Sequence, residues 1–272
     1  MDTLQLRTLS GSSTTVDAAE LEAFRAHLQG ELLTPDQPAY EDARKIWYAM
    51  IERRPAAIVR CRTVDDIAHG VNFARSHNLL ISVRGGGHNI AGNALCEQGL
   101  MIDLSQMKAV QVDPETQTAK VGPGATLADF DREAQKYGLA TPLGINSTTG
   151  VAGLTLGGGF GWLTRKYGVT VDNLIGADVI TANGQRVHAS EQENADLFWG
   201  IRGGWRQLWH RHQLRVSLAS GRPGNHGGSG GVSLRSGQVC ALSVPGIGRQ
   251  SVRRYHGLGR AAACSAPAFL AC

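Results

Sequence analysis

Acidic side chains and lysine are missing from the last quarter of this sequence. Residues 205–272 contain nine arginines but no Asp, Glu or Lys, whereas residues 1–204 hold 18 basic and 23 acidic side chains. The last segment is rich in Gly and Ser, shows no amphipathic period and lacks the composition of a packed domain. The sequence therefore divides near residue 204 into an ordinary acidic globular part and a basic part of different character.

Several other features are scarce. No run of about 18 apolar residues occurs, so we expect no membrane span. The first residues lack a basic segment followed by an apolar core, so we expect no secretory leader and a cytoplasmic location. The five cysteines show no spacing typical of a metal site, which predicts reduced structural thiols and no metal; they are Cys61, Cys96, Cys240, Cys264 and Cys272.

Helical and strand patterns alternate in the first part of the chain. Thr63 and Thr126 are predicted N-caps, Gly138 ends a helix, and Asn183-Gly184 is typical of a hairpin turn. The pattern favours an α+β or α/β fold with many short strands and no internal repeat. The predicted helices are 17–28, 64–77 and 127–137, and the predicted strands are 57–61, 79–83, 100–104, 117–121 and 177–181.

The segment Ser-Val-Arg-Gly-Gly-Gly-His-Asn, residues 82–89, carries the most chemical information. An apolar run over 79–83 ends there, which is typical of a buried strand that enters a turn. Consecutive glycines leave backbone N–H groups free to converge on an anion, because no Cβ atom intervenes. The segment therefore predicts a loop for a phosphate-bearing cofactor with His88 beside it.

A second glycine cluster, Gly-Val-Ala-Gly-Leu-Thr-Leu-Gly-Gly-Gly-Phe-Gly, covers residues 150–161. Its spacing differs from the Gly-x-Gly-x-x-Gly fingerprint of Rossmann domains. A single cluster of this kind could be a glycine-rich turn packed against a neighbouring element. Two clusters in one chain favour a long ligand with a pyrophosphate in its middle.

These segments, with Pro-Leu-Gly at 142–144, Asp-Asn-Leu at 172–174 and Trp-Gly-Ile-Arg-Gly-Gly at 199–204, resemble the FAD-linked oxidases with a PCMH-type FAD-binding domain. That group includes berberine bridge enzyme, oligosaccharide oxidases and hydroxynicotine oxidases. The resemblance implies an α+β, two-subdomain FAD-binding fold over residues 40–204, preceded by an N-terminal helical extension over 1–39. It also implies an oxidase that transfers hydride from an alcohol or amine carbon of a small-molecule substrate to FAD, with oxygen as the later acceptor.

The same resemblance assigns a covalent role to His88. In the family, the histidine at this position is bonded to the 8α-methyl carbon of the flavin, and a neutral imidazole is a suitable nucleophile. Some relatives carry a second tether, a cysteine four residues before the glycine that corresponds to Gly150. Asn146 stands there in this chain, so we predict FAD with a single covalent link through His88.

Further cofactor contacts are expected on the glycine loops and their flanks. Arg84 is expected to fix its loop or to face a phosphate, and Asp172 and Asn173 form an Asx turn or touch the cofactor. Backbone atoms near Val179 approach the adenine end in the family. The expected residues are Arg84, Gly85, Gly86, Gly87, Asn89, Pro142, Gly144, Thr148, Thr149, Gly150, Gly153, Thr155, Gly157, Gly158, Gly159, Asp172, Asn173 and Val179.

The resemblance stops abruptly after Gly204. Relatives continue Gly-Gly-Asn-Phe-Gly-Ile-Val-Thr-Ser-Phe-Glu-Phe, whereas this chain has Trp-Arg-Gln-Leu-Trp-His-Arg-His-Gln-Leu-Arg-Val over 205–216. The residues of 205–216 can be back-translated with codons that, when read one base later, encode the family segment residue for residue. We call the two readings the visible frame and the hidden frame. The third bases of the visible codons are largely free choices, but the second base of each visible codon is the first base of a hidden codon and so constrains the match. We therefore hypothesise a single-nucleotide insertion just after Gly204.

An out-of-frame segment would replace the substrate domain over residues 205–272. We expect it to be disordered or poorly packed, because nothing has selected it to bury a core. Its arginines also suggest a nucleic-acid binder, but the shifted frame explains them better, and we expect neither nucleic-acid nor membrane partners. The catalytic residues would lie in the missing domain, so activity would be impaired; the alternative is a non-catalytic FAD-binding fragment or pseudogene product.

Overall fold

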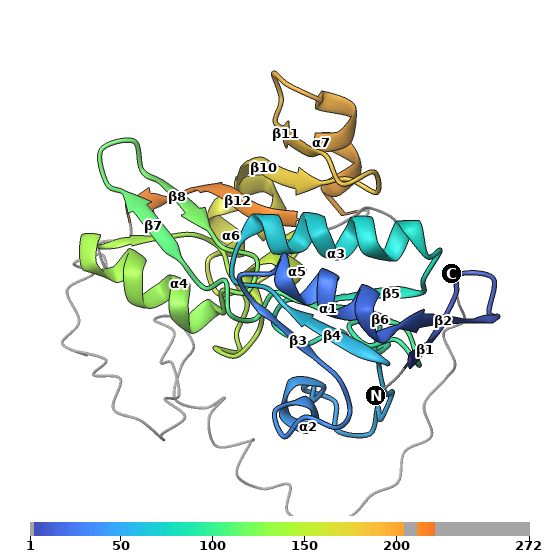
Figure 1. Ribbon diagram of the computed structural model, residues 1–272. Coiled ribbons are helices and arrows are strands. Elements are labelled where there is room, and N and C mark those ends of the chain that lie inside the picture. The colour runs from blue at the N-terminus through green and yellow to red at the C-terminus, as the bar shows by residue number, and fades with distance from the viewer. Residues whose placement is uncertain (1–2, 204–210, 221–272) are drawn as a thin grey trace, which may run out of the picture. The chain divides into compact units, whose positions relative to one another are not determined.

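The computed structural model describes residues 3–203 and 211–220 (Figure 1). Two larger sheets organise these residues: one of four strands in the order β3-β4-β6-β5 and one of five strands in the order β11-β10-β12-β8-β7. Two-stranded sheets pair β1 with β2 and β9 with β13. The mixture of helix and sheet confirms the α+β class.

The four-stranded sheet is parallel at its centre. Strands β4 (Ala57–Arg60) and β5 (Ile81–Arg84) both pair in parallel with β6 (Leu100–Asp103), and β3 (Glu31–Leu33) adds an antiparallel edge. Helices cover such sheets on both faces, so the central strands are continuous apolar runs. Alternate side chains serve opposite faces: Leu100 and Ile102 enter one apolar core, whereas Met101 enters another.

Two helices pack over the first of these faces. α1 (Ala18–Ala26) and α3 (Val64–Ser76) lie side by side across the sheet in Figure 1, and Phe24 stacks on Phe73 with ring centroids 4.1 Å apart. The Thr63 hydroxyl accepts from the amide of Asp66, whose carboxylate accepts from the Thr63 amide. This reciprocal cap starts α3 where the sequence predicts.

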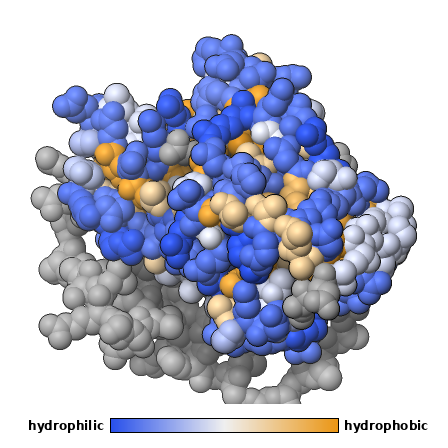
Figure 2. All heavy atoms as spheres, in the orientation of Figure 1, coloured by the Kyte–Doolittle hydropathy of each residue, from blue (hydrophilic) through white to orange (hydrophobic). Residues whose placement is uncertain are grey.

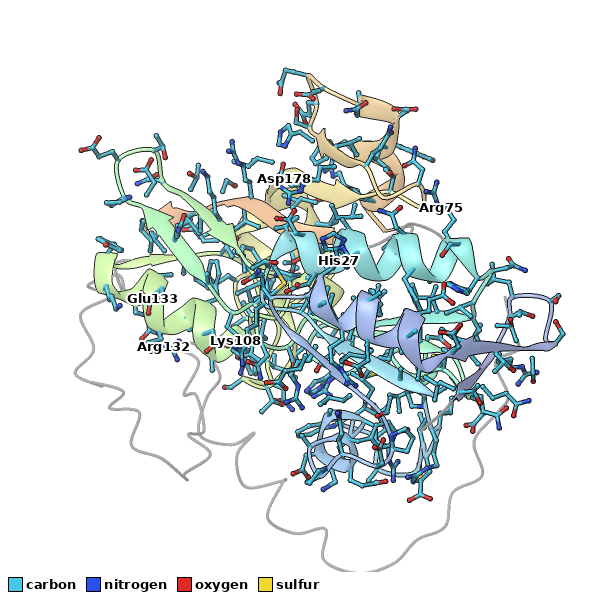
Figure 3. The ribbon with its side chains drawn as sticks, viewed as in Figure 1. His27, Arg75, Lys108, Arg132, Glu133 and Asp178 are labelled. Atoms are coloured by element: carbon cyan, nitrogen blue, oxygen red, sulfur yellow. The ribbon has the colours of Figure 1, made fainter. Side chains whose placement is uncertain are left out.

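The five-stranded sheet is antiparallel throughout. Its core includes Phe130 of α4, Ile201 of α7 and Val179 of β10, all almost fully buried. On the outer side of α4, Arg132 donates to Asp129 and lies 3.5 Å from Glu133 (Figure 3). The elements of this half are β7 (Val110–Asp113), β8 (Thr118–Val121), α4 (Leu127–Ala134), η1 (Gln135–Tyr137), β9 (Leu139–Ala140), α5 (Val151–Leu156), α6 (Thr164–Tyr167), η2 (Thr170–Asn173), β10 (Leu174–Ile180), β11 (Arg186–Ala189) and α7 (Ala195–Ile201).

The predicted elements are present, with ends shifted by a few residues. Gly138 ends the 127–137 helical segment at a φ of 64°, and Gly184 turns the β10–β11 hairpin at a φ of 78°. Both are left-handed conformations that favour glycine. No helix within the two described ranges is long and apolar enough to cross a bilayer.

The segment 1–39 differs from the helical extension that the sequence suggested. Besides α1 it contains the hairpin of β1 (Thr3–Arg7) and β2 (Ser13–Asp17), followed by β3. Leu4 and Leu6 are buried from alternate positions of β1 and join the core beneath α3. This two-residue period identifies a strand, and it was overlooked because the adjacent helix pattern is stronger. Beyond 39, α2 (Tyr40–Ala43) covers the other face of the sheet.

The expectation of disorder over the whole of 205–272 is wrong for residues 211–220. β12 (Arg211–Ser217) lies between β10 and β8 inside the five-stranded sheet, and β13 (Ala219–Ser220) pairs with β9. Leu214 and Val216 are buried while Arg215 between them is exposed. That alternation is sufficient for a half-buried strand. The rest of the predicted tail lies outside the described residues.

We expect Leu214→Ala to lower the free energy of unfolding by about 2–4 kcal/mol, because it leaves a cavity in the core. Arg215→Ala is the matched control on the exposed face of the same strand and should cost less than about 0.5 kcal/mol. Urea unfolding of the full chain, followed by circular dichroism, measures both. Equal, small effects would contradict the central placement of β12.

Candidate functional site

The two glycine clusters meet backbone to backbone. A Cβ atom added to Gly86 would lie under 3.0 Å from the amide nitrogen of Gly150, and one added to Gly150 would lie 2.7 Å from the nitrogen of Gly86. One added to Gly85 would lie 2.8 Å from the Pro123 carbonyl oxygen. Only glycine allows these approaches. Two of the three consecutive glycines therefore serve loop packing, rather than leaving the whole turn bare.

Part of each loop nevertheless presents free backbone. The amides of Gly86, Gly87 and His88 have no hydrogen-bond partner among the residues that the structure describes. In the second cluster, Gly153 is exposed on α5 and Gly158 lies in the loop after it, and a Cβ atom at either would meet nothing within 4 Å. Successive unpaired amides and open backbone are what a phosphate-bearing ligand requires.

His88 is held between two elements. Its ring stacks on Trp47, with centroids 4.5 Å apart and planes inclined by 19°, and its Nε2 lies 2.9 Å from the Thr148 hydroxyl. The Trp47 amide donates to the Gly87 carbonyl at 3.1 Å and fixes the indole beside the glycine loop. Burial lowers the pKa of His88, so the neutral, nucleophilic ring predominates at neutral pH.

A short hydrogen-bonded chain extends from the histidine. The Asn146 Oδ1 accepts from the Thr148 amide at 3.0 Å and from the Thr148 hydroxyl at 2.8 Å. The Asn146 carbonyl also accepts from the Thr149 amide at 3.0 Å. The sequence identified these residues through the glycine cluster that they precede, but it did not connect Asn146 with His88.

Arg84 is fixed inside the protein. Its guanidinium donates to the Ala43 carbonyl, and its Nε lies 3.8 Å from the carboxylate of Asp103, which is fully buried. Arg60 lies 3.7 Å from the same carboxylate. A buried carboxylate between two guanidiniums is a structural ion cluster. Of the two roles left open for Arg84, this placement favours fixing of the loop.

Other predicted residues hold their own loops. The Asp172 carboxylate accepts from the Val169 amide at 2.9 Å, and the Asn173 side chain donates to two nearby carbonyls. The Asn89 side chain caps the following turn by accepting from the Asn93 amide at 2.9 Å. The bonds of Asp172 and Asn173 run back to residues 167–169 and hold the turn to the segment before it, so they are not those of an Asx turn, in which the side chain accepts from an amide two residues further on.

The remaining predicted residues divide between core and loop surface. Val179 is buried in β10, and the Thr155 hydroxyl donates to a carbonyl within α5. Pro142 is buried, and a Cβ at Gly144 would touch leucine side chains, whereas Gly157 is exposed. A Cβ at Gly159 would meet Thr170.

Three buried hydroxyls near these loops lack partners among the described residues: Ser82 in β5, which leads into the first loop, and Thr141 and Thr170 beside the second cluster. Thr141 precedes Pro142, Thr170 packs against Gly159, and neither side-chain oxygen has a hydrogen-bond partner in the described part of the chain. Buried hydroxyls of this kind require a partner, so they fit a polar ligand in these loops. Sequence reasoning missed Thr141 and Thr170, as it missed Trp47, because isolated Thr and Trp residues carry no motif.

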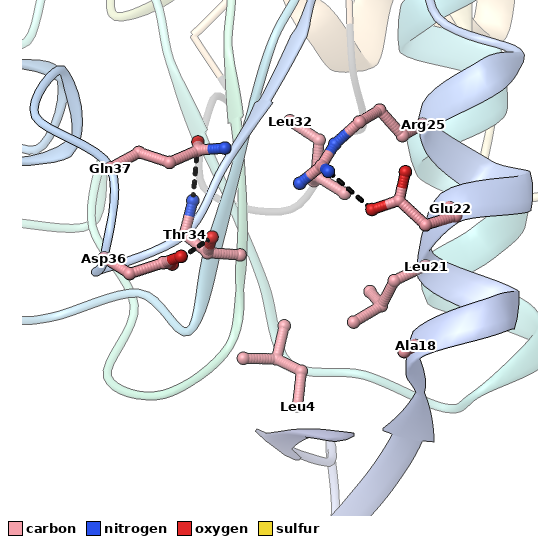
Figure 4. A pocket seen from close by; sticks show the side chains of 9 residues that line it. All are labelled: Leu4, Ala18, Leu21, Glu22, Arg25, Leu32, Thr34, Asp36 and Gln37. Atoms are coloured by element: carbon pink, nitrogen blue, oxygen red, sulfur yellow. Dashed lines mark hydrogen bonds and ion pairs between the residues drawn. The ribbon is translucent and has the colours of Figure 1, made fainter. Parts of the chain in front are cut away.

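The described surface offers few alternatives to the glycine loops as a binding site. Figure 2 shows a largely hydrophilic face with scattered apolar residues, and Ile145, Phe160 and Trp162 are exposed along the glycine loops. A small pocket of about 130 Å³ beside α1 shares no residue with these loops and is too small for a dinucleotide (Figure 4).

Burial raises the pKa of Cys61 and of Cys96, so both are unreactive thiols.

The chain is similar to several known oxidases. It is 39% identical over 176 residues to (R)-6-hydroxynicotine oxidase of Paenarthrobacter nicotinovorans, a match that covers 65% of this chain and 38% of that protein. The solved structure of 6-hydroxy-D-nicotine oxidase from Arthrobacter nicotinovorans superposes with a TM-score of 0.69 at 37% identity, over 70% of this chain and 42% of that one.

Xylooligosaccharide oxidase from Myceliophthora thermophila, solved with xylobiose, gives a TM-score of 0.70 at 31% identity, over 73% of this chain and 42% of that one. The chain thus spans about two fifths of the length of these relatives. The family model described as an FAD binding domain matches residues 55–190, half of the sequence. With two glycine loops, a PCMH-type fold and this match in agreement, the chain belongs to the FAD-binding domain family of the FAD-linked oxidases.

Proposed function

We propose that this chain is the cofactor-holding part of an FAD-dependent oxidase and that His88 is its sole covalent anchor for FAD. The observation that carries the proposal is the environment of His88. The ring follows a loop with free amides and stacks on Trp47, and only its Nε2 is hydrogen-bonded to a residue that the structure describes. Asn146, at the position of the second tether in some relatives, cannot form a thioether.

The chain's own residues would hold the cofactor at several points. The amides of Gly86, Gly87 and His88 are free to bind phosphate oxygens. The unpartnered hydroxyls of Thr141 and Thr170 would donate to further polar atoms. Bound FAD supplies the hydride acceptor, and the remaining residues expected to contact it are proposed on the family resemblance.

The proposed reaction is hydride removal from an alcohol or amine carbon of a small molecule, with oxygen regenerating the oxidised flavin. Relatives named for a hydroxynicotine and for oligosaccharides support this substrate range. The alternative is an FAD-binding fragment without catalysis. Oxygen consumption by the purified, flavin-loaded chain with candidate sugars and amines separates the two.

The shifted reading frame is proposed as the origin of residues 205–216. The hidden frame encodes Phe at the positions of Leu214 and Val216 and Glu at the position of Arg215. In the structure Leu214 and Val216 are buried and Arg215 is exposed. The two frames thus specify the same alternation for β12, as expected if the shift occurs before this strand, just after Gly204. The nucleotide sequence at the codons for Gly204 and Trp205 tests the idea, and an unshifted frame there would refute it.

We expect the purified wild-type chain to retain flavin after acid denaturation, as an intact mass increased by one FAD. His88→Ala should lose this adduct completely, because it removes the nucleophile. The control is His27→Ala, which changes the C-cap residue of α1 outside the glycine loops and should keep the adduct. A wild-type chain that releases all its flavin would refute the covalent link.

Gly86→Ala and Gly153→Ala should separate loop packing from cofactor contact. The new Cβ at Gly86 would collide with Gly150, so we expect a loss of about 2 kcal/mol or more in the free energy of unfolding of the apoprotein. At Gly153, exposed on α5, the new Cβ meets only open space, so stability should be kept or raised by up to about 1 kcal/mol, while FAD affinity should be lowered. Urea unfolding and flavin-fluorescence titration measure the two effects; unchanged FAD affinity in Gly153→Ala would exclude cofactor contact there.

A further inference from the structure

The contacts between His88, Thr148 and Asn146 bear on which imidazole nitrogen carries the proton. The Asn146 Oδ1 accepts from the backbone N–H of Thr148 at 3.0 Å. Only the amide oxygen, and not the NH2 group, can accept from a backbone N–H, so the orientation of the Asn146 side chain is fixed. The Thr148 hydroxyl lies 2.8 Å from the same oxygen and must donate to it.

A hydroxyl has one proton to donate. Because the Thr148 proton is directed to Asn146, its oxygen can only accept from the His88 Nε2, 2.9 Å away. In the neutral ring, Nε2 therefore holds the hydrogen and Nδ1 holds the lone pair. Nδ1 makes no hydrogen bond to any residue in the described ranges, and Trp47 stacks on the ring and restricts its tilt.

We propose that Thr148 and Asn146 are positioning residues that hold His88 in the Nε2–H tautomer, which leaves Nδ1 free to bond to FAD. The inference rests on the proposed covalent link for its consequence, but the tautomer itself is a property of the chain without cofactor. It assigns to Asn146 a function in place of the second tether, because its side chain orients the first.

The bonding step balances with oxygen as the oxidant. The Nδ1 lone pair forms the new N–C bond at the 8α carbon, one methyl C–H bond breaks, and the displaced electron pair reduces the flavin ring. Alkylation would make the imidazole cationic, and its Nε2 proton, hydrogen-bonded to the Thr148 oxygen until then, would be released to solvent. Molecular oxygen takes up the two electrons and the two released protons as hydrogen peroxide.

Nitrogen NMR of the apoprotein tests the tautomer directly. The full chain is produced in riboflavin-limited cells with 15N-labelled histidine, the spectrum of His88→Ala identifies the His88 signals, and the pH is kept about 1.5 units above the pKa of a free histidine. We expect a protonated Nε2 and a bare Nδ1. In Asn146→Leu the Thr148 hydroxyl has no acceptor at position 146 and can donate to Nε2, so the tautomer population of His88 should move toward Nδ1–H. Asn146→Asp keeps an acceptor for the Thr148 hydroxyl and should not reverse the tautomer.

The rate of covalent attachment is the second readout. At saturating FAD, Thr148→Val should slow the formation of the FAD adduct about tenfold, the value of a lost hydrogen bond to the reacting ring. Thr148→Ser keeps the hydroxyl and should restore the rate. Ser147→Ala is the matched control, because its side chain makes no hydrogen bond within the described residues.

The outcomes distinguish the two proposals. A wild-type chain without covalent flavin refutes the proposed link, while the NMR result still decides the tautomer. A bare Nε2 in the wild-type apoprotein, or equal attachment rates in Thr148→Val and wild type, overturns the positioning role. Attachment found at Nε2 in the isolated flavin peptide would overturn it as well.

Discussion

The contact between Gly86 and Gly150 is the constraint on which the candidate site depends. It joins a loop that follows the parallel sheet to a loop that leads into α5 beside the antiparallel sheet, with no side chain between them. Because the backbones touch, His88 on one loop comes within hydrogen-bond distance of Thr148 on the other. A Cβ at either glycine would separate the loops, and the histidine would lose its partner.

Local signals were sufficient to predict the elements that carry this contact. Thr63 and Thr126 cap their helices, and the apolar run of 100–102 is a buried central strand, as their patterns predict. These features depend on neighbours in sequence. The position of Trp47 on His88 depends on a long-range approach, and so does the interaction of His88 with Thr148 across 60 residues. Periodicity does not encode such pairs, so only the fold reveals them.

The glycines of the first loop show how the structure can change the physical reason for a residue that the sequence singles out. The sequence suggested that the consecutive glycines of the first loop expose their backbone to a phosphate. Gly86 instead lets a second loop approach, while the amides of Gly86, Gly87 and His88 pair with no residue of the described ranges. Close packing and free amides occur together in glycine. Because it has no Cβ atom, another backbone can approach where a side chain would stand, while its N–H points elsewhere and stays available to a ligand. Composition alone cannot separate these roles.

Strand β12 was the largest error in the predicted fold, and the genetic code offers a physical reason. Every codon with T at its second base encodes an apolar residue. If the frame is shifted by one base, each hidden Phe codon, which begins with T, forces an apolar residue in the visible chain. Leu214 and Val216 would be such residues, buried at alternate positions, while Arg215 remains exposed. A strand within a sheet needs little more than this alternation, so the segment can pack without having been selected for its present residues. The same argument does not extend to a substrate site, which needs particular side chains rather than a pattern of polarity.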